Sequence, residues 1–414
     1  MTTMLEMGKK AKAAYRVLSL AGSAQKNTAL QASAKALLER NAQIIAANHI
    51  DMDNGRNKQL SAAMLDRLHL NEARIKAISD GMLAIALMPD PVGCELEAWD
   101  RPSGLHIRKV TVPLGVIGII YESRPNVTAD AGAICLKSGN AAILRAGADS
   151  LHSSQAIMEC LRIGLVQSGL PEDCLQLVQS VDRAIVGEML QLVDYIDVIV
   201  PRGGKSLTAR VDSESRIPTI LHLDGNCHIY VHAAADLAKT LRVVNNAKLR
   251  RTGVCGAAES LLIDAEIASE FLPAIINALP QVEIRGDAAA MTIDPRIVPA
   301  NDEDWSSEYL DKIISVKIVA NVCDAAKHIN QYGSHHTDCI ITEDANIAAQ
   351  FLANVDSAIV MHNTSTQFAD GGEFGMGAEI GISTGRLHAR GPVGAAQLVT
   401  YKYVVTSDGA LRAV

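Results

Sequence analysis

Short apolar segments alternate with helix-like segments through most of this chain, and this alternation constrains the fold more than any other feature. Strand-like apolar runs occupy residues 116–121, 141–145, 175–178, 195–200 and 217–221. Helix-like segments lie between them, at residues 127–137, 151–168, 183–192 and 205–215. Parallel strands that are buried on both faces have continuous apolar sequences, whereas strands with one solvated face alternate. The pattern therefore predicts a doubly wound α/β sheet.

The same alternation returns after residues 228–232, which predicts a second doubly wound α/β domain. Its expected strands are residues 260–263, 282–285, 313–319 and 339–342. Residues 1 to about 90 carry apolar side chains at three- and four-residue spacing, so they are expected to be mostly helical, with Asn71 as an N-cap. Two segments of alternating polarity, 105–112 and 398–405, are expected to form a small flap that pairs with another subunit.

Length, charge and cysteine usage exclude several functional classes. A chain of 414 residues is too long for one core and fits two or three domains. A net charge of −8, with Lys and Arg scattered, argues against a nucleic-acid or anionic-membrane surface. We expect no secretory signal and no apolar run of the ~18 residues that span a bilayer. The eight cysteines include no C-x-x-C pair, so free thiols in a reducing cytoplasm are expected.

One cysteine, Cys255, follows a run of cations and lies between Gly253 and Gly256. Glycines on both sides let the backbone turn sharply and let a substrate approach the sulfur. Neighbouring cations favour the thiolate, which is the nucleophilic form. Cys255 is therefore a candidate nucleophile. The alternative is a small buried apolar residue, which is the usual environment of a free cysteine.

Asn126 follows the first apolar strand and precedes a helix. Sheets of this class bind ligands beyond the carboxyl ends of their strands, so the loops at those ends are expected to carry the function. An amide at this position can donate hydrogen bonds to an oxyanion. It can equally cap the helix that follows, and the sequence leaves both readings open.

Two more loops place arginine and glycine between a strand and a helix, at Arg145 with Gly147 and at Arg202 with Gly203 and Gly204. A cation beside a helix N-terminus suits a phosphate group. Such glycine pairs are also common in ordinary turns. No G-x-G-x-x-G fingerprint is present, so any dinucleotide is held without it.

A glycine-dense segment at residues 369–377 contains Glu373 and Phe374, which suit a ribose and a ring face. The adjacent residues His335 and His336 belong to the segment 332–338, which precedes an expected strand. Neighbours on a strand point to opposite faces, and no recognised metal-ligand spacing surrounds them. We therefore expect no metal site.

Several longer motifs occur in order and resemble the gamma-glutamyl phosphate reductase (glutamate-5-semialdehyde dehydrogenase) family of the aldehyde dehydrogenase superfamily. Besides the Cys255 loop, they are Glu122-Ser123-Arg124-Pro125-Asn126-Val127-Thr128, Leu136-Lys137-Ser138-Gly139-Asn140, Tyr332-Gly333-Ser334-His335-His336-Thr337-Asp338, Gly371-Gly372-Glu373-Phe374-Gly375-Met376-Gly377-Ala378-Glu379-Ile380-Gly381-Ile382-Ser383-Thr384-Gly385 and Leu387-His388-Ala389-Arg390-Gly391-Pro392. The resemblance covers essentially the whole chain.

The resemblance implies NADPH-dependent reduction of L-glutamyl 5-phosphate to L-glutamate 5-semialdehyde, with release of phosphate, in proline synthesis. It implies Cys255 as the nucleophile, Asn126 as the oxyanion-binding amide, Arg145 at the adenosine ribose and Glu373 at the nicotinamide ribose. Gly147, Arg202, Gly203, Gly204 and Phe374 complete the expected cofactor site. For the substrate we expect Arg251, Thr252 and His336, with Arg124 and Arg250 as other candidates for the phosphate.

The implied architecture is aldehyde-dehydrogenase-like. Residues 1–98 and 113–225 are expected to form the cofactor domain, 226–392 the catalytic domain, and 99–112 with 393–414 a β oligomerisation flap. The implied partners are the small-molecule substrate, the upstream glutamate kinase and further copies of the chain.

Hydrolytic aldehyde dehydrogenases carry a Glu in a Glu-Leu-Gly-Gly segment that activates water, and residues 221–226 contain no Glu. Structural roles are expected for His222 and Asp224 in this stretch. A hydrolytic NAD(P)-dependent aldehyde dehydrogenase, or a catalytically silent scaffold, remain the alternatives.

Overall fold

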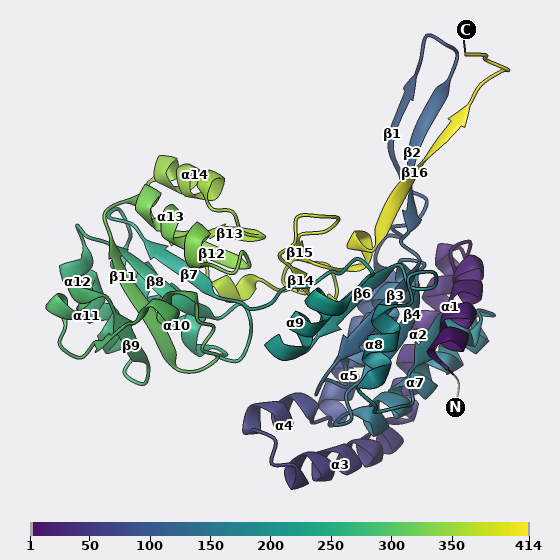
Figure 1. Cartoon of the computed structure of the whole chain (residues 1–414), viewed down its shortest axis with the longest axis horizontal. Helices are drawn as coiled ribbons and strands as arrows, with labels where there is room; N and C mark the ends of the chain where they lie inside the picture. The colour runs from purple at the N-terminus through teal and green to yellow at the C-terminus, as the bar shows by residue number, and fades with distance from the viewer. Residues whose placement is uncertain (1–2, 413–414) are drawn as a thin grey trace. The chain divides into compact units, whose positions relative to one another are not determined.

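The computed structural model describes residues 3–412, and the chain divides into two compact units. Unit 1 comprises the described part of residues 1–220, 375–381 and 393–414, and unit 2 comprises residues 221–374 and 382–392. Both have the α/β architecture that the sequence predicts (Figure 1). No helix among residues 3–412 combines the length and the apolar character needed to cross a bilayer.

Unit 1 begins with five helices, in agreement with the helical periodicity of the first 90 residues. They are α1 (Met4–Leu18), α2 (Ser23–Glu39), α3 (Asn41–Asn57), α4 (Ala62–Leu68) and α5 (Glu72–Leu87). Asn71 caps α5 as predicted, because its side-chain oxygen accepts a hydrogen bond from the Arg74 backbone N–H at 2.9 Å.

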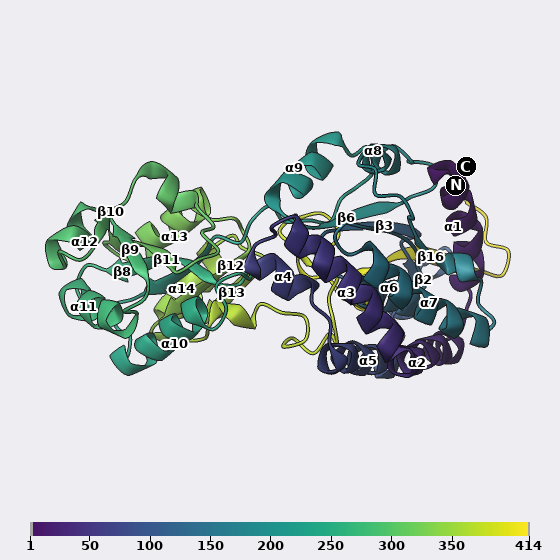
Figure 2. The same ribbon diagram turned by 90° about the horizontal axis from the view of Figure 1, so that it is seen from below.

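The centre of unit 1 is a four-stranded parallel sheet in the order β5-β4-β3-β6. Its strands are β3 (Val116–Tyr121), β4 (Ala141–Ala146), β5 (Leu175–Leu177) and β6 (Val198–Arg202). Its connecting helices are α6 (Val127–Lys137), α7 (Leu151–Gln167), α8 (Ala184–Leu190) and α9 (Lys205–Glu214). Helices α6 and α7 cover one face, with α2, α3 and α5 outside them, while α1, α8 and α9 lie on the other face (Figure 2).

The prediction of a strand at residues 217–221 was wrong. This segment joins the sheet only through one isolated bridge, between Thr219 and Ile199. Its apolar side chains Ile217 and Ile220 are buried. The apolar run therefore indicated that this connecting segment is buried, but it did not indicate that its backbone forms the hydrogen bonds of a strand.

The two segments of alternating polarity pair in a separate antiparallel sheet in the order β1-β2-β16. It consists of β1 (Glu95–Asp100), β2 (His106–Pro113) and β16 (Val399–Thr406), with β2 in the middle. Figure 1 shows this sheet as an arm that projects from the rest of unit 1. Strand β1, the third member, was not predicted.

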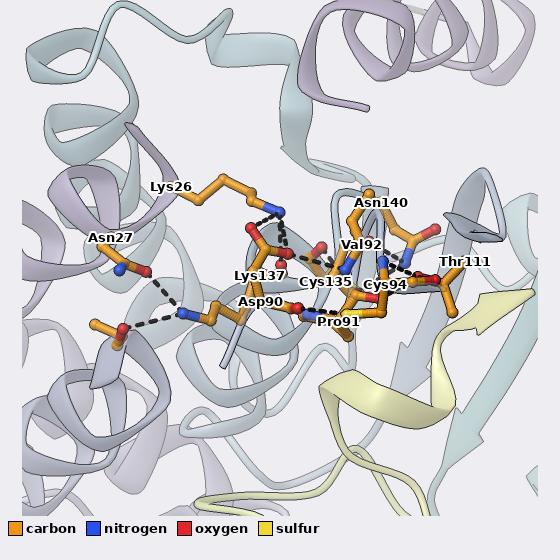
Figure 3. Close-up of polar contacts among 12 residues, drawn as sticks. Lys26, Asn27, Asp90, Pro91, Val92, Cys94, Thr111, Cys135, Lys137 and Asn140 are labelled. Atoms are coloured by element: carbon orange, nitrogen blue, oxygen red, sulfur yellow. Dashed lines mark hydrogen bonds and ion pairs between the residues drawn. The ribbon is translucent and has the colours of Figure 1, made fainter. Parts of the chain in front are cut away.

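The Leu136-Lys137-Ser138-Gly139-Asn140 motif organises the packing of unit 1 around buried polar groups (Figure 3). The Lys137 ammonium donates to the Asn27 side chain and the Ala86 carbonyl at 2.8 and 3.0 Å. Gly139 adopts a positive φ of 73°, and a Cβ there would lie 2.8 Å from a ring carbon of Pro113. Asn140 accepts from the Gly115 N–H and donates to the Leu398 carbonyl, which anchors the base of the arm. This motif is structural.

Unit 2 contains a seven-stranded parallel sheet in the order β10-β9-β11-β8-β7-β12-β13. Its strands are β7 (Cys227–Val231), β8 (Ala258–Asp264), β9 (Glu283–Gly286), β10 (Val298–Pro299), β11 (Ile313–Val319), β12 (Thr337–Ile341) and β13 (Ile359–His362). Its helices are α10 (Leu237–Leu249), α11 (Ala268–Ala278), α12 (Ala288–Ile293), α13 (Val322–Tyr332) and α14 (Ala345–Asn354). A short pair, β14 (Ile382–Ser383) and β15 (Gly391–Pro392), completes the unit.

The core of unit 2 lies on both faces of this sheet. Helices α10, α11 and α12 pack on one face around Leu261, Leu272 and Ile314, and α13 and α14 pack on the other around Leu262 and Phe351. Strand side chains alternate between the two clusters, as burial on both faces requires.

Candidate active site

Cys255 lies in the turn between α10 and β8. It is partly exposed, whereas Cys135, Cys160, Cys174, Cys227 and Cys339 are buried. Burial raises the pKa of Cys135, Cys174 and Cys339 to about 12 and that of Cys160 to about 11, and it raises the pKa of Cys227 well above its usual range. These buried thiols stay protonated near neutral pH, and a protonated thiol is a poor nucleophile.

The backbone of Cys255 packs directly against Gly225, the residue two positions before β7. A Cβ on Gly225 would lie 2.2 Å from the Cys255 carbonyl oxygen and 2.7 Å from its Cβ. The buried Cys227 thiol donates to the same carbonyl oxygen at 3.0 Å. Because nothing larger than hydrogen fits at Gly225, the segment before β7 fixes the position of the Cys255 turn.

Three side chains that are far apart in the sequence meet at Cys255. The donor atoms of His222, Cys255 and His336 all lie within 4.8 Å of one another. His222 precedes β7, Cys255 precedes β8 and His336 precedes β12. These three strands are neighbours, with β7 between β8 and β12. The amino ends of parallel strands meet at one edge of a sheet, so the order of the strands brings the three residues together.

The Tyr332–Asp338 motif was expected among the loops at carboxyl strand ends, but it spans the end of α13 and the start of β12. The Cys255 loop and the Tyr332–Asp338 motif both precede their strands in unit 2. Helix α10 leads into the Cys255 turn, and helix α13 leads into the turn that carries His336. His222 was expected to be structural, but its ring lies beside Cys255 and contacts the His336 ring edge-to-face, with centroids 5.1 Å apart. The sequence signal was its place in residues 221–226, the stretch that corresponds to the Glu-Leu-Gly-Gly segment of hydrolytic aldehyde dehydrogenases.

The imidazoles of the cluster are held by fixed partners. His222 Nδ1 lies 2.7 Å from the Ile382 carbonyl oxygen, which can only accept, so this nitrogen carries the hydrogen. His336 is buried, and its Nδ1 lies 2.9 Å from the Thr337 hydroxyl oxygen. The preceding residue His335 has a positive φ of 59° and lies by the Asp356 carbonyl instead, so the two adjacent histidines diverge.

A buried ion pair closes the base of the Cys255 turn. The Lys248 ammonium, in the last turn of α10, contacts the Glu259 carboxylate near the start of β8, and both side chains are fully buried. Burial raises the pKa of Glu259 to about 7, although the Lys248 charge opposes this shift. The Leu310 N–H donates to the same carboxylate at 3.2 Å. The pair therefore joins the two ends of the segment that carries Cys255.

In unit 1, Asn126 occupies the N-cap position of α6, but its side chain makes no capping bond. Its amide donates instead to the Asp130 carboxylate at 2.8 Å. This excludes the interpretation of Asn126 as a simple helix cap. Burial raises the pKa of Asp130 to about 6, while the Asn126 amide and the Arg202 charge act in the opposite direction.

Arg145 is the last residue but one of β4 and is only 5% exposed. Its Nη2 donates to the Val181 carbonyl at 3.1 Å, and its Nε has no hydrogen-bond partner within residues 3–412. Burial lowers its pKa. A buried guanidinium with an unsatisfied donor suits an anionic or oxygen-rich ligand. Gly147 follows, where a Cβ would lie 2.3 Å from an Asp149 carboxylate oxygen.

The loops after β3 and β6 flank the point where the strand order of unit 1 reverses. Sheets of this type bind ligands in such a crevice. At Gly203 a Cβ would collide with Leu207 and Glu122, whereas Gly204 has open space in front of it. Gly204 is the N-cap of α9, and no side chain caps this end of the helix, which is the end that favours anions.

Unit 2 contains a cavity of about 570 Å³ beside α10 and the short helix η3 (Thr366–Phe368). Glu373, Arg242 and Arg250 line it. Phe374 is exposed, as is Arg251, and Thr252 is partly exposed.

The predicted residues thus divide between the units. Cys255, His336, Glu373 and the residues just named lie in unit 2, and Asn126 and the Arg-Gly loops lie in unit 1.

Comparison with known proteins identifies the family. The aldehyde dehydrogenase family model matches residues 3–312. A relative from Brucella suis biovar 1, named gamma-glutamyl phosphate reductase, is 57% identical over 99% of this chain and 98% of its own. One of the same name from Rhodospirillum rubrum is 57% identical over 99% of this chain and 96% of its own.

Solved structures agree. The crystal structure of gamma-glutamyl phosphate reductase from Thermotoga maritima is 44% identical to this chain and superposes with a TM-score of 0.96 over 99% of both chains. Near-complete coverage in both directions means that the whole fold, and not one domain of it, is shared. The chain therefore belongs to the aldehyde dehydrogenase superfamily and, within it, to the gamma-glutamyl phosphate reductase family.

Proposed function

We propose that this chain catalyses the NADPH-dependent reduction of L-glutamyl 5-phosphate to L-glutamate 5-semialdehyde with release of phosphate, in proline biosynthesis. The observation that carries the proposal is the partly exposed Cys255 with two imidazoles beside it, in a chain that shares its whole length with reductases of that name. The substrate is an acyl phosphate, an activated carbonyl with a good leaving group.

In the first half of the reaction, the Cys255 thiolate attacks the acyl carbon. The carbon–oxygen bond to phosphate breaks, and a thioester forms at Cys255. The Cys255 backbone N–H stabilises the oxyanion, and the Asn126 amide has the same role by its family position. Arg251 and Thr252 are our candidates for contacts with the substrate.

In the second half, NADPH, when bound, supplies the hydride that reduces the thioester carbonyl. Cys255 then carries a thiohemiacetal, which collapses to the aldehyde and the free thiolate. The net reaction consumes one proton, and the imidazoles of His222 and His336 are proton carriers beside the sulfur. The site must exclude water from the thioester, because hydrolysis would destroy the activated acyl group.

The residues of unit 1 fit a phosphorylated dinucleotide. The unsatisfied Nε of the buried Arg145 suits a ribose or its phosphate, and the open N-terminus at Gly204 suits the diphosphate. In unit 2, Glu373 lines a cavity large enough for part of such a ligand. These features support NADPH as the cofactor. From the family resemblance we also propose a cytoplasmic homo-oligomer that contacts the upstream glutamate kinase.

The test is a coupled assay of the reverse reaction with purified full-length protein. Oxidation of L-glutamate 5-semialdehyde by NADP⁺ is expected to require inorganic phosphate, because phosphate must displace the acyl group from Cys255. Turnover without phosphate would support the hydrolytic alternative. The Cys255→Ala variant is expected to bind NADPH and to show no turnover, and activity in this variant would exclude the proposed nucleophile.

A further inference from the structure

We propose that Cys255, His222 and His336 form a binding site for a thiophilic divalent cation such as Zn²⁺, which blocks the nucleophile reversibly. The three donors lie within 4.8 Å of one another at the amino ends of adjacent strands. One thiolate and two imidazoles form a ligand set that prefers Zn²⁺ or Co²⁺ over Mg²⁺ or Ca²⁺. Their sequence positions are so far apart that no ligand spacing reveals the set.

The geometry requires only a small adjustment. With bonds of about 2.0–2.1 Å to nitrogen and about 2.3 Å to sulfur, a tetrahedral zinc ion holds its donor atoms about 3.4–3.6 Å apart. The donor atoms of the three residues lie up to 4.8 Å apart, so they must approach one another by about 1 Å to bind the ion. Cys255 is partly exposed, so rotation of its side chain can supply this movement, while His222 keeps its hydrogen bond to the Ile382 carbonyl and the buried His336 stays in place.

The surroundings already fix the rings as they are fixed around bound metals. Metal-bound histidines usually donate their other ring N–H to a carbonyl or a similar acceptor, which sets the tautomer and the ring orientation. His222 does this through Nδ1 to the Ile382 carbonyl, so that Nε2 carries the lone pair of the neutral ring. His336 Nδ1 faces the Thr337 hydroxyl and, at 3.7 Å, the Cys227 sulfur.

Binding has a defined chemical consequence. The cation displaces the thiol proton to solvent and forms a metal–sulfur bond, and water takes the fourth position. The lone pair that would attack the acyl carbon is then engaged. Inhibition by the cation rests on the proposed function, but binding of the cation does not.

Co²⁺ is the probe, because thiolate coordination gives an ultraviolet charge-transfer band and tetrahedral geometry gives strong visible bands. Titration of the reduced, chelator-free full-length protein is expected to show both, with one equivalent bound and displaced by Zn²⁺. Cys255→Ser is expected to lose the charge-transfer band. His336→Asn and His222→Asn each remove a ligand, so each is expected to weaken binding by more than the roughly 10–100-fold that the loss of an outer-shell partner costs.

Two matched controls keep the test specific. His335→Asn removes the adjacent histidine, which lies by the Asp356 carbonyl, and Cys323→Ser removes an exposed thiol at the start of α13. Both are expected to bind Co²⁺ like the wild type. The inference is overturned if the wild type gives no charge-transfer band. It is also overturned if Cys255→Ser and both histidine variants bind Co²⁺ as tightly as the wild type, once circular dichroism has shown that these variants are folded.

The outcome for the metal is separate from the outcome for the reaction. In the forward assay, Zn²⁺ is expected to inhibit and a chelator to restore activity. A protein that binds Co²⁺ through these residues but has no reductase activity would leave the metal site standing and reject the proposed function. A protein that has reductase activity but gives no cobalt spectrum would support the proposed function and reject the metal site.

Discussion

Gly225 sets the position of the candidate nucleophile at the scale of single residues. Its missing side chain leaves the space that the Cys255 carbonyl and Cβ occupy. A glycine in such a contact cannot be replaced without moving one of the two backbones. The chemistry therefore depends on a residue that takes no part in it.

Replacing Gly225 by Ala is expected to lower kcat/KM roughly 100-fold, because a shift of about 1 Å in the reacting atom costs that much. The control is Gly81→Ala in α5, where a Cβ meets nothing within 4 Å. That substitution is expected to leave activity unchanged and to stabilise the protein by about 0.5–1 kcal/mol. Steady-state kinetics and urea unfolding measure both effects, and wild-type kinetics in Gly225→Ala would contradict the assignment.

Asp130, the acceptor for Asn126, gives a prediction about pH. Its folded-state pKa of about 6 lies above the ordinary 3.8, so its contribution to stability is present below pH 3.8 and is lost as the pH rises through 6. The free energy of unfolding of the wild type, relative to Asp130→Asn, is expected to fall between about pH 4 and pH 6 and then stay level. Urea unfolding across this range measures it, and a constant difference would contradict the prediction.

At the scale of secondary-structure elements, the Cys255 turn depends on how α10 and β8 are joined. The Lys248–Glu259 pair connects them inside unit 2, where both charges are shielded from water. Such a pair adds little net stability compared with apolar packing, but removing one partner leaves the other charge buried and alone.

Lys248→Met is therefore expected to destabilise the protein by about 3–5 kcal/mol. Lys239→Met is the control on the same helix, because Lys239 forms a more exposed pair with Glu343 and its loss is expected to cost about 1 kcal/mol or less. Denaturant unfolding compares the two. Adding Glu259→Leu to Lys248→Met is expected to recover most of the loss, and equal stability of the two single variants would contradict the role of the pair.

At the scale of the whole molecule, the arm formed by β1, β2 and β16 has more apolar surface than its own strands can bury. Tyr401 and Tyr403 are exposed, and Trp99 meets Tyr403 edge-to-face with ring centroids 6.2 Å apart. Both outer strands, β1 and β16, have one edge without a partner among residues 3–412. Exposed aromatic surface and open strand edges are typical of an interface.

Tyr403→Asp is expected to dissociate the protein into monomers, because a carboxylate would be buried at the proposed interface. Lys402→Asp is the control, since neighbouring residues of a strand point to opposite faces. Light scattering after size exclusion gives the mass of each species. A wild type that is already monomeric, or a Tyr403→Asp variant that keeps the wild-type mass, would contradict oligomerisation through this face.

The sequence by itself determined the fold class, most of the elements and the family. Apolar runs and helical periodicity are patterns between residues close in the chain. They predicted most of the parallel strands of both units, but not β10 and β13, together with the helical first 90 residues and the two alternating strands of the arm. The cations and glycines around Cys255 likewise distinguished it from the seven other cysteines.

Only the tertiary structure decided which strands lie side by side. Strand order is a non-local property that no periodicity encodes, yet it brings His222 and His336 to Cys255 at the amino ends of β7, β12 and β8. The tertiary structure likewise decided that Ile217 and Ile220 are buried without forming a strand of the sheet, and that the Asn126 amide contacts Asp130 instead of capping α6. Each of these depends on which neighbours share a buried space, and only the folded chain determines that.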